Sequence, residues 1–258
     1  VVLSGSGAST YTWNNGVVNN TPFTPQTTNN YVVTGTDVNG CVNTDTTAVT
    51  VNALPNVNAG VNQAICIGQS TSLTATGAST YTWNNGISNG VSFTPNATNN
   101  YIVTGVNNNG CVNQDTVSVV VNPLPNVSAG NNQTVCLNTA VVLSGSGAST
   151  YTWNNGVVNN TPFTPQTTNN YVVTGTDVNG CVNTDTTTVT VNALPNVNAG
   201  VNQAICIGQS TSLTATGAST YTWNNGVVNN TPFTPQTTNN YVVTGTDVNG
   251  CVNTDTTT

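Results

Sequence analysis

The sequence predicts an all-β protein: a tandem array of small β-sandwich domains of about 70 residues each, forming a rod or filament. The stretch from Cys66 to Cys111 recurs as 136–181 and 206–251, with a period of 70 residues. Within each copy, short alternating apolar runs are separated by Asn-Gly and Gly-rich turns, and no run has a helical period. Two cysteines per copy are typical of small domains whose cores need crosslinks.

Short linkers with the sequence ALPN or PLPN divide the chain into four predicted domains. Residues 1–53 are expected to be a partial repeat without its first strand and first cysteine. Residues 54–123 and 124–193 are complete repeats, and 194–258 is a repeat whose last strand is truncated. Proline stiffens a linker and cannot donate to a central strand. Linkers this short predict that neighbouring domains touch and form a semi-rigid rod.

The expected strands of the second repeat alternate with turn sequences. Pairs such as Asn109-Gly110 tolerate the positive φ angles of a hairpin turn, and Pro95 stops the strand before it. Alternation places Tyr81 and Trp83 on the same face of one strand. The expected strands are 57–66, 72–76, 81–83, 91–93, 101–105 and 117–121, with turns at 67–70, 77–79, 84–86 and 109–110.

The apolar and aromatic residues of these strands predict the core. In the second repeat the core residues are Leu73, Ala75, Tyr81, Trp83, Phe93, Tyr101, Val103, Val117, Val119 and Val121. The aromatic core positions across the repeats are Trp13, Trp83, Trp153 and Trp223, with Tyr31, Tyr101, Tyr171 and Tyr241. Exposed tryptophans can stack on sugars, but a place in a middle strand favours the core.

The composition excludes several classes of function. The chain has no Lys, Arg or His, and its net charge of -7 comes from seven acidic residues. Nothing can therefore neutralise nucleic-acid phosphates or an anionic membrane surface. No segment reaches the roughly 18 apolar residues of a membrane-inserted helix. General acid-base catalysis needs His, Glu, Lys or an Asp with a tuned pKa, and only scattered Asp, Tyr and Cys are present, so we predict no enzyme and no cofactor.

A family resemblance rests on the spacing of these residues. The Trp83 position resembles the buried tryptophan of an immunoglobulin-like sandwich, and Tyr101 resembles its tyrosine corner, although Val103 stands where that fold usually has its second cysteine. The full pattern resembles the PKD-like and immunoglobulin-like repeats of large Bacteroidetes surface proteins, many of them type IX-secreted adhesins. That pattern is Cys66-x-Gly68, Leu73-Thr-Ala75, Gly77-Ala78, Tyr81-x-Trp83, Tyr101-x-Val103 and Gly110-Cys111. The resemblance implies an extracellular tandem-repeat protein.

The cysteine pairing has two alternatives. Because a small domain needs its own crosslink, we expect bonds within each repeat, and Cys41 then pairs with a residue outside the sequence. If the first turn and the last hairpin lie at opposite ends of an immunoglobulin-like sandwich, those bonds exceed the roughly 7 Å limit between Cα atoms. The expected pairs are Cys66–Cys111, Cys136–Cys181 and Cys206–Cys251, and the alternative pairs are Cys66–Cys181 and Cys136–Cys251. A zinc site is not expected, since there is no histidine and no Cys-x-x-Cys.

Two further patterns suggest sites. Asp37, Asn39, Asn43 and Asp45 offer closely spaced oxygen ligands for calcium, although a plain hairpin also explains them. The recurring Asp-Thr pairs resemble an O-glycosylation signal of the same bacterial group, and this resemblance implies a glycoprotein. The acceptors would be Thr46, Thr116, Thr186 and Thr256, although solvent-facing strand positions explain them as well.

The predicted function is structural. We expect a segment of a long extracellular fibre or adhesin stalk, secreted or attached to the cell surface, that provides reach, stiffness and self-association. Repeated copies of one module favour it, because they give a surface that recurs along the chain. In the alternative, the repeats are adhesin modules that bind glycans or a host surface.

Overall fold

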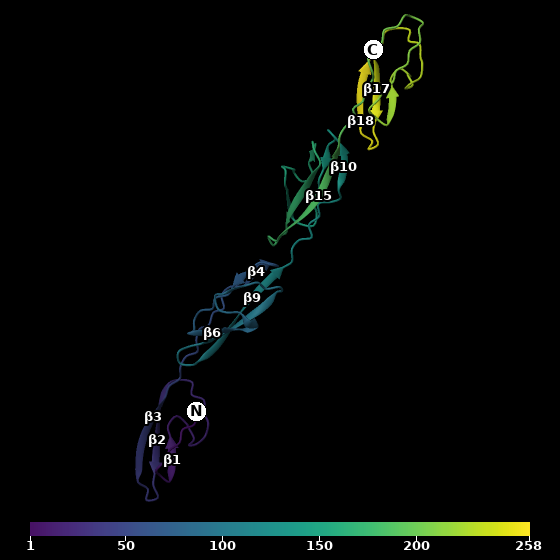
Figure 1. The fold of residues 1–258 in the computed structure, drawn as a ribbon. Helices are drawn as coiled ribbons and strands as arrows, with labels where there is room; N and C mark the ends of the chain where they lie inside the picture. The colour runs from purple at the N-terminus through teal and green to yellow at the C-terminus, as the bar shows by residue number, and fades with distance from the viewer. The chain divides into compact units, whose positions relative to one another are not determined.

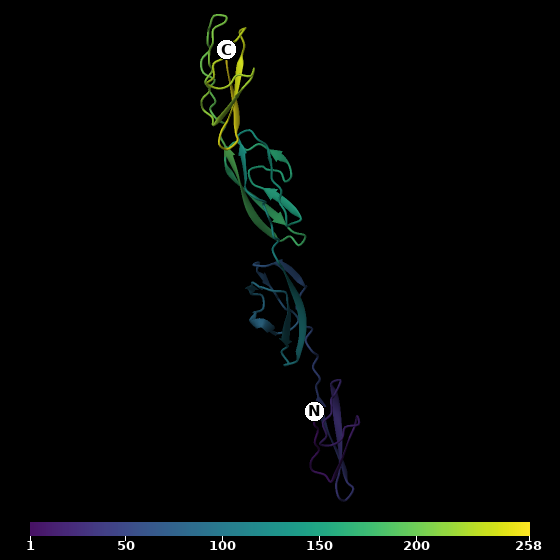
Figure 2. The same ribbon diagram turned by 90° about the vertical axis from the view of Figure 1, so that its right-hand side faces the viewer.

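The computed structural model describes residues 1–258, and the chain is almost entirely β-strand, turn and loop. It divides into two compact units, Val1–Val121 and Asn122–Thr258. Figures 1 and 2 show the sheets of each unit from two directions. The structure has no helix with the length and apolar character needed to span a membrane. The all-β fold class is confirmed.

The first unit contains nine strands. They are β1 (Thr10–Trp13), β2 (Asn29–Thr36), β3 (Val42–Val49), β4 (Gln63–Cys66), β5 (Thr71–Ser72), β6 (Thr80–Trp83), β7 (Ser92–Phe93), β8 (Asn99–Val106) and β9 (Val112–Asn122). One 3₁₀ turn, η1 (Asn84–Gly86), lies at the predicted 84–86 turn, where Asn85 adopts a φ of 57°. Residues 1–53 contribute the three-stranded sheet β1-β2-β3 (Figure 1).

The second unit repeats this arrangement. Its strands are β10 (Gln133–Cys136), β11 (Val141–Val142), β12 (Thr150–Trp153), β13 (Pro162–Phe163), β14 (Asn169–Thr176), β15 (Val182–Asn192), β16 (Thr220–Trp223), β17 (Tyr241–Thr246) and β18 (Val252–Thr257). The sheets respect the predicted repeats, since no sheet contains strands of two of them. The predicted domain boundaries themselves stay predictions.

Each complete repeat is a sandwich of a four-stranded and a two-stranded sheet. In residues 54–122 the sheets are β4-β9-β8-β6 and β5-β7. Successive side chains of a strand point to opposite faces, so alternate residues of β8 and β9 enter the core. Val103, Val117 and Val119 are fully buried there, and Trp83 and Tyr101 pack in the same cluster.

The segment that begins the second, third and fourth repeats pairs in two separate parts. We call residues 54–66, 124–136 and 194–206 the leading segments. In the third repeat, Ser128 pairs with Ser146 on one side, and β10 then pairs in parallel with the C-terminal part of β15. Gly60, with a φ of 90°, interrupts the second repeat's leading segment. The prediction of one continuous strand over 57–66 was therefore wrong, because only Gln63–Cys66 joins a sheet, while Asn58 makes an isolated bridge to Thr76.

Candidate functional site

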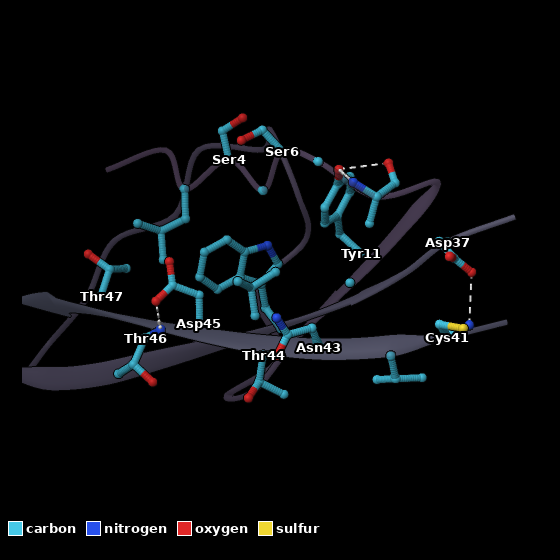
Figure 3. A pocket seen from close by; sticks show the side chains of 18 of the residues that line it. Ser4, Ser6, Tyr11, Asp37, Cys41, Asn43, Thr44, Asp45, Thr46 and Thr47 are labelled. Atoms are coloured by element: carbon cyan, nitrogen blue, oxygen red, sulfur yellow. Dashed lines mark hydrogen bonds between the residues drawn. The ribbon is translucent and has the colours of Figure 1, made fainter. Parts of the chain in front are cut away.

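A groove of about 540 Å³ lies on residues 1–53. It lies between the segment Val2–Ala8 and strand β3. Figure 3 shows Asp45 and Thr47 on the groove side of the strand and Thr44 and Thr46 on the other side. The apolar floor is formed by Leu3, Tyr11, Trp13 and Val33.

In the complete repeats the leading segment occupies the equivalent place. An added Cβ on Gly175 would lie 2.5 Å from a methyl carbon of Val127, and one on Gly147 would lie 1.9 Å from the Asn126 carbonyl oxygen. These glycines are therefore required where the leading segment passes. Of their equivalents in residues 1–53, Gly7 has room, since an added Cβ would meet nothing within 4 Å, whereas one on Gly35 would lie 2.9 Å from the Ala8 Cβ.

The open groove leaves apolar residues of the first repeat more accessible than their equivalents. Trp13 is half-buried, whereas Trp83, Trp153 and Trp223 are 5%, 9% and 5% exposed. Thr47 is exposed, but its equivalent Thr187 is completely buried and donates to the Asn131 carbonyl oxygen at 2.9 Å. The core placement predicted for Trp13 is thus incomplete, because no leading segment covers its ring.

An aspartate on the last strand anchors each leading segment. The backbone N–H of Ala129 donates to Oδ2 of Asp185 at 2.8 Å. This bond has the largest effect on the pKa of Asp185, and the bond from the Thr186 N–H has the next largest; both lower the pKa, whereas desolvation raises it. The pKa of Asp115 is lowered in the same way by the Ala59 and Thr116 N–H groups, and that of Asp255 by the Ala199 and Thr256 N–H groups. Asp45 accepts from the Thr46 N–H at 2.8 Å, and its second oxygen has no such partner.

The calcium candidates are separate hairpin and strand residues rather than a cage. Oδ1 of Asp37 accepts the backbone N–H groups of Asn39 and Cys41, both at 2.8 Å. Figure 3 shows the bond from Cys41. Asn107 makes the same two bonds in the second repeat, at 3.0 and 2.9 Å, so the turn requires an oxygen acceptor but no charge. No group of three His, Cys, Asp or Glu side chains is placed to hold a metal.

The candidate glycosylation threonines share one environment. Thr46, Thr116, Thr186 and Thr256 are all exposed on the last strand of their repeats. The aspartate before each of the last three is required by its bond to the leading segment. The fold therefore accounts for the recurrence of the Asp-Thr pair, and glycosylation of these hydroxyl groups stays a prediction.

Hydrogen bonds hold Trp83 and Tyr81 in place. The indole N–H of Trp83 donates to Oδ1 of Asn89 at 3.0 Å, and the same oxygen accepts the Ala75 N–H at 2.7 Å. The Tyr81 hydroxyl exchanges two hydrogen bonds with the backbone of Ala78, each 2.7 Å long. Tyr101, to which the sequence assigned the tyrosine-corner role, packs against Phe93 instead, with ring centroids 5.1 Å apart and ring planes tilted by 56°.

Sequence reasoning missed both Asn89 and the role of the Tyr81 hydroxyl. The signal was available, because the Ala-Ser-Thr-Tyr-x-Trp sequence and an Asn six residues after the Trp recur in all four repeats. The four tyrosines bond to the alanine three residues before them in every repeat.

A disulfide joins two consecutive predicted repeats. Cys136 is bonded to Cys251, with a Cα–Cα distance of 5.5 Å and a sequence separation of 115 residues. Cys41, Cys111 and Cys206 are free thiols. The expected bonds Cys66–Cys111, Cys136–Cys181 and Cys206–Cys251 are therefore wrong, and the alternative Cys136–Cys251 is present. Cys41 has no partner in the chain, and its pairing with a residue outside the sequence stays a prediction.

Strand geometry explains this correction. Cys136 lies opposite Asn192, at the end of β15, whereas Cys181 immediately precedes the start of that strand. β15 has 11 residues, and at about 3.3 Å per residue its ends are roughly 35 Å apart. Disulfide Cα atoms lie within about 7 Å. The two cysteines of one repeat thus sit at opposite ends of their sandwich.

No protein-family model matches the chain, and no curated protein sequence matches it. The chain is similar to the Ca²⁺-stabilized adhesin with which an Antarctic bacterium reaches out and binds ice, at 16% identity and a TM-score of 0.33, over 90% of this chain and 80% of that one. It is also similar to the N-terminal eight Ig domains of Down Syndrome Cell Adhesion Molecule isoform 1.30.30 (12%, TM-score 0.33). That match covers 97% of this chain, which spans half the length of the other. The insect immune protein hemolin matches at 12% identity and a TM-score of 0.28, over 99% and 93% of the two chains.

Proposed function

We propose that this chain is a structural segment of a long extracellular fibre or adhesin stalk, of the kind found in large bacterial surface proteins. Its tandem sandwiches supply reach and stiffness, and its uncharged Thr- and Asn-rich faces allow self-association. The role is not enzymatic. The Cys136–Cys251 bond supports an oxidising, extracellular location, because such bonds persist outside reducing compartments.

The observation that carries this proposal is the position of the disulfide. A bond within a repeat would stabilise that domain alone. The Cys136–Cys251 bond instead gives residues 124–193 and 194–258 a second covalent connection in addition to the ALPN linker. Two connections restrict the bending and rotation that a single linker permits, which is the property a stalk requires.

The alternative, in which the repeats themselves bind glycans, has less support. Stacking on a sugar needs an exposed aromatic face. Trp83, Trp153 and Trp223 are buried, and each indole N–H already donates to an asparagine. The hydroxyl groups of Tyr81, Tyr151 and Tyr221 are likewise bonded to the backbone.

Electron microscopy of the oxidised chain tests the proposal. We expect rods with a narrow distribution of bend angles between the last two repeats. The variant with Cys136→Ser and Cys251→Ser should show a broader distribution, and the matched control Cys206→Ser, which alters a free exposed thiol, should resemble the parent. Equal bending in all three chains, together with saturable binding on a glycan array, would reverse the assignment in favour of ligand-binding modules.

A further inference from the structure

We propose that the Asn-Gly turns that follow strands β1, β12 and β16 are sites of spontaneous deamidation. The reacting residues are Asn15, Asn155 and Asn225. Each is converted to aspartate or isoaspartate without an enzyme or a cofactor, because the attacking group is the backbone nitrogen of the next residue. The modification therefore depends only on the turn itself and on water.

The reaction uses two groups of the turn and one water molecule. The backbone nitrogen of Gly156 gives its proton to a solvent base and attacks Cγ of Asn155. The new N–Cγ bond closes a five-membered succinimide ring, the Cγ–Nδ2 bond breaks, and the amide nitrogen leaves as ammonia. Water then opens the ring at either carbonyl carbon, which gives aspartate or isoaspartate, and nothing is oxidised or reduced. Glycine favours the attack because it has no side chain to obstruct the approach of its nitrogen.

The structure leaves both reacting groups of this turn accessible. Asn155 and Gly156 are exposed and adopt positive φ angles of 54° and 71°. The bond that closes the turn runs from the Val157 N–H to the Asn154 carbonyl oxygen at 3.3 Å, so the Gly156 N–H makes no hydrogen bond. The Asn155 side chain makes one long contact, from Nδ2 to the Asn170 carbonyl oxygen at 3.4 Å. Nothing else has to be broken before the nitrogen can attack.

The same turn recurs in the first and fourth repeats. The φ angles are 57° and 71° at Asn15-Gly16, and 52° and 70° at Asn225-Gly226. The following valine closes each of these turns at 3.3 Å, and the N–H groups of Gly16 and Gly226 stay unbonded. The asparagine before each reacting residue is not followed by glycine, and its Oδ1 accepts a backbone N–H of the neighbouring strand at 2.9 Å. Only the second asparagine of each pair is therefore expected to react.

The second repeat contains an Asn-Gly pair that the fold protects. The Gly90 N–H donates to the Leu73 carbonyl oxygen at 2.8 Å. Oδ1 of Asn89 accepts the Ala75 N–H at 2.7 Å and the Trp83 indole N–H at 3.0 Å. These three bonds have to break before the Gly90 nitrogen can attack Asn89. At the net strength of ordinary protein hydrogen bonds, this requirement makes the reaction about a hundredfold slower.

The Asn-Gly pairs of the last hairpins form an intermediate class. The Gly110 N–H donates to the Asn107 carbonyl oxygen at 3.0 Å, and the equivalent bonds of Gly40, Gly180 and Gly250 are 3.2 Å long. One bond has to break at each of these sites. The asparagine before each glycine should therefore react more slowly than Asn155 and faster than Asn89.

Deamidation changes both the charge and the backbone of the turn. Each reaction replaces a neutral amide by a carboxylate, and the chain has no Lys or Arg to balance it. Reaction at all three sites takes the net charge from -7 to -10. Isoaspartate also adds one atom to the main chain of the turn, directly before Val157 and Val227, which are buried in the cores of their repeats.

The test follows the whole oxidised chain by peptide mapping after incubation in mildly alkaline buffer. Chymotryptic cleavage after Trp and Phe gives the same peptide, NNGVVNNTPF, from residues 14–23, 154–163 and 224–233, and a different one, NNGISNGVSF, from residues 84–93. Fragment-ion mass spectrometry assigns each conversion to one asparagine and separates Asn89 from Asn85 within the second peptide. We expect the second asparagine of NNGVVNNTPF to be converted about a hundredfold faster than Asn89.

The control is the same chain, reduced and unfolded in urea. Its hydrogen bonds are lost, so Asn89 should react as fast as the second asparagine of NNGVVNNTPF. Two results would overturn the proposal. One is equal conversion of Asn89 and the turn asparagines in the folded chain, and the other is a turn asparagine that folding slows as strongly as it slows Asn89.

Discussion

The Cys136–Cys251 bond sets how far the chain can be stretched between its ends. The perturbation isolates this bond: Cys41, Cys66, Cys111, Cys181 and Cys206 are all replaced by serine. Force applied to the two termini of the oxidised variant passes through the disulfide. The residues between Cys136 and Cys251 then carry no tension and cannot extend.

The magnitude follows from the sequence separation of 115 residues. A fully extended residue contributes about 3.3 to 3.6 Å. Single-molecule force spectroscopy should therefore give a contour length that is roughly 380 to 410 Å longer after reduction than before it. Unfolding events that extend residues 137–250 should appear only in the reduced chain.

A matched variant keeps Cys136 and Cys181 in place of Cys136 and Cys251. Because these cysteines lie at opposite ends of one sandwich, its contour length should not change on reduction. If this control lengthens and the first variant does not, the bond lies within the repeat, and the argument from strand geometry fails.

Three other predictions concern the stability of the repeats. Trp83→Ala should lower the free energy of unfolding of residues 54–123 by about 3 to 5 kcal/mol in urea, because it leaves a cavity at a buried site. Ile102→Ala, at a 39% exposed position, should cost far less. Equal costs would place Trp83 outside the core. Tyr81→Phe should lower the free energy of unfolding by about 1 to 3 kcal/mol, since it removes both hydrogen bonds to the Ala78 backbone. Tyr101→Phe should be nearly neutral, because the Tyr101 hydroxyl makes no hydrogen bond. A larger loss for Tyr101→Phe than for Tyr81→Phe would return the tyrosine-corner role to Tyr101. The lowered pKa of Asp115, Asp185 and Asp255 contributes stability that is complete above the ordinary carboxyl pKa of about 3.9 and is lost as the pH falls through the lowered folded-state value. Melting temperatures between pH 6 and 2 should show this loss, and replacement of all three by asparagine should flatten the profile; an unchanged slope would contradict the assignment.

The sequence was sufficient for the strands whose side chains alternate. Val117 and Val119 are fully buried as their period of two predicts, while Val121, at the end of β9, is only half-buried. Turn sequences were equally informative, because Asn and Gly are needed where φ is positive, as at Gly110 and Asn85.

The sequence did not show which backbone groups the polar side chains would reach. The bond from Ala59 to Asp115 joins residues 56 positions apart, and that pairing depends on how the two sheets stack. The disulfide partner depended on the same information. Both pairings of Cys136 satisfy the repeat period, and only the length of β15 decides between them.

The polar residues of this chain mostly serve its own backbone. Asp37 and Asn107 hold equivalent turns with and without a charge, and Asp115 accepts amide N–H groups in place of a cation. A chain without Lys or Arg can therefore hold its carboxylates in place with backbone N–H groups. Most of the residues that resemble metal ligands in the sequence already accept hydrogen bonds from the backbone. The repeats then differ in the covalent bonds of their cysteines. The stiffness proposed for the stalk then belongs to the linker and the Cys136–Cys251 disulfide, which together connect residues 124–193 to residues 194–258.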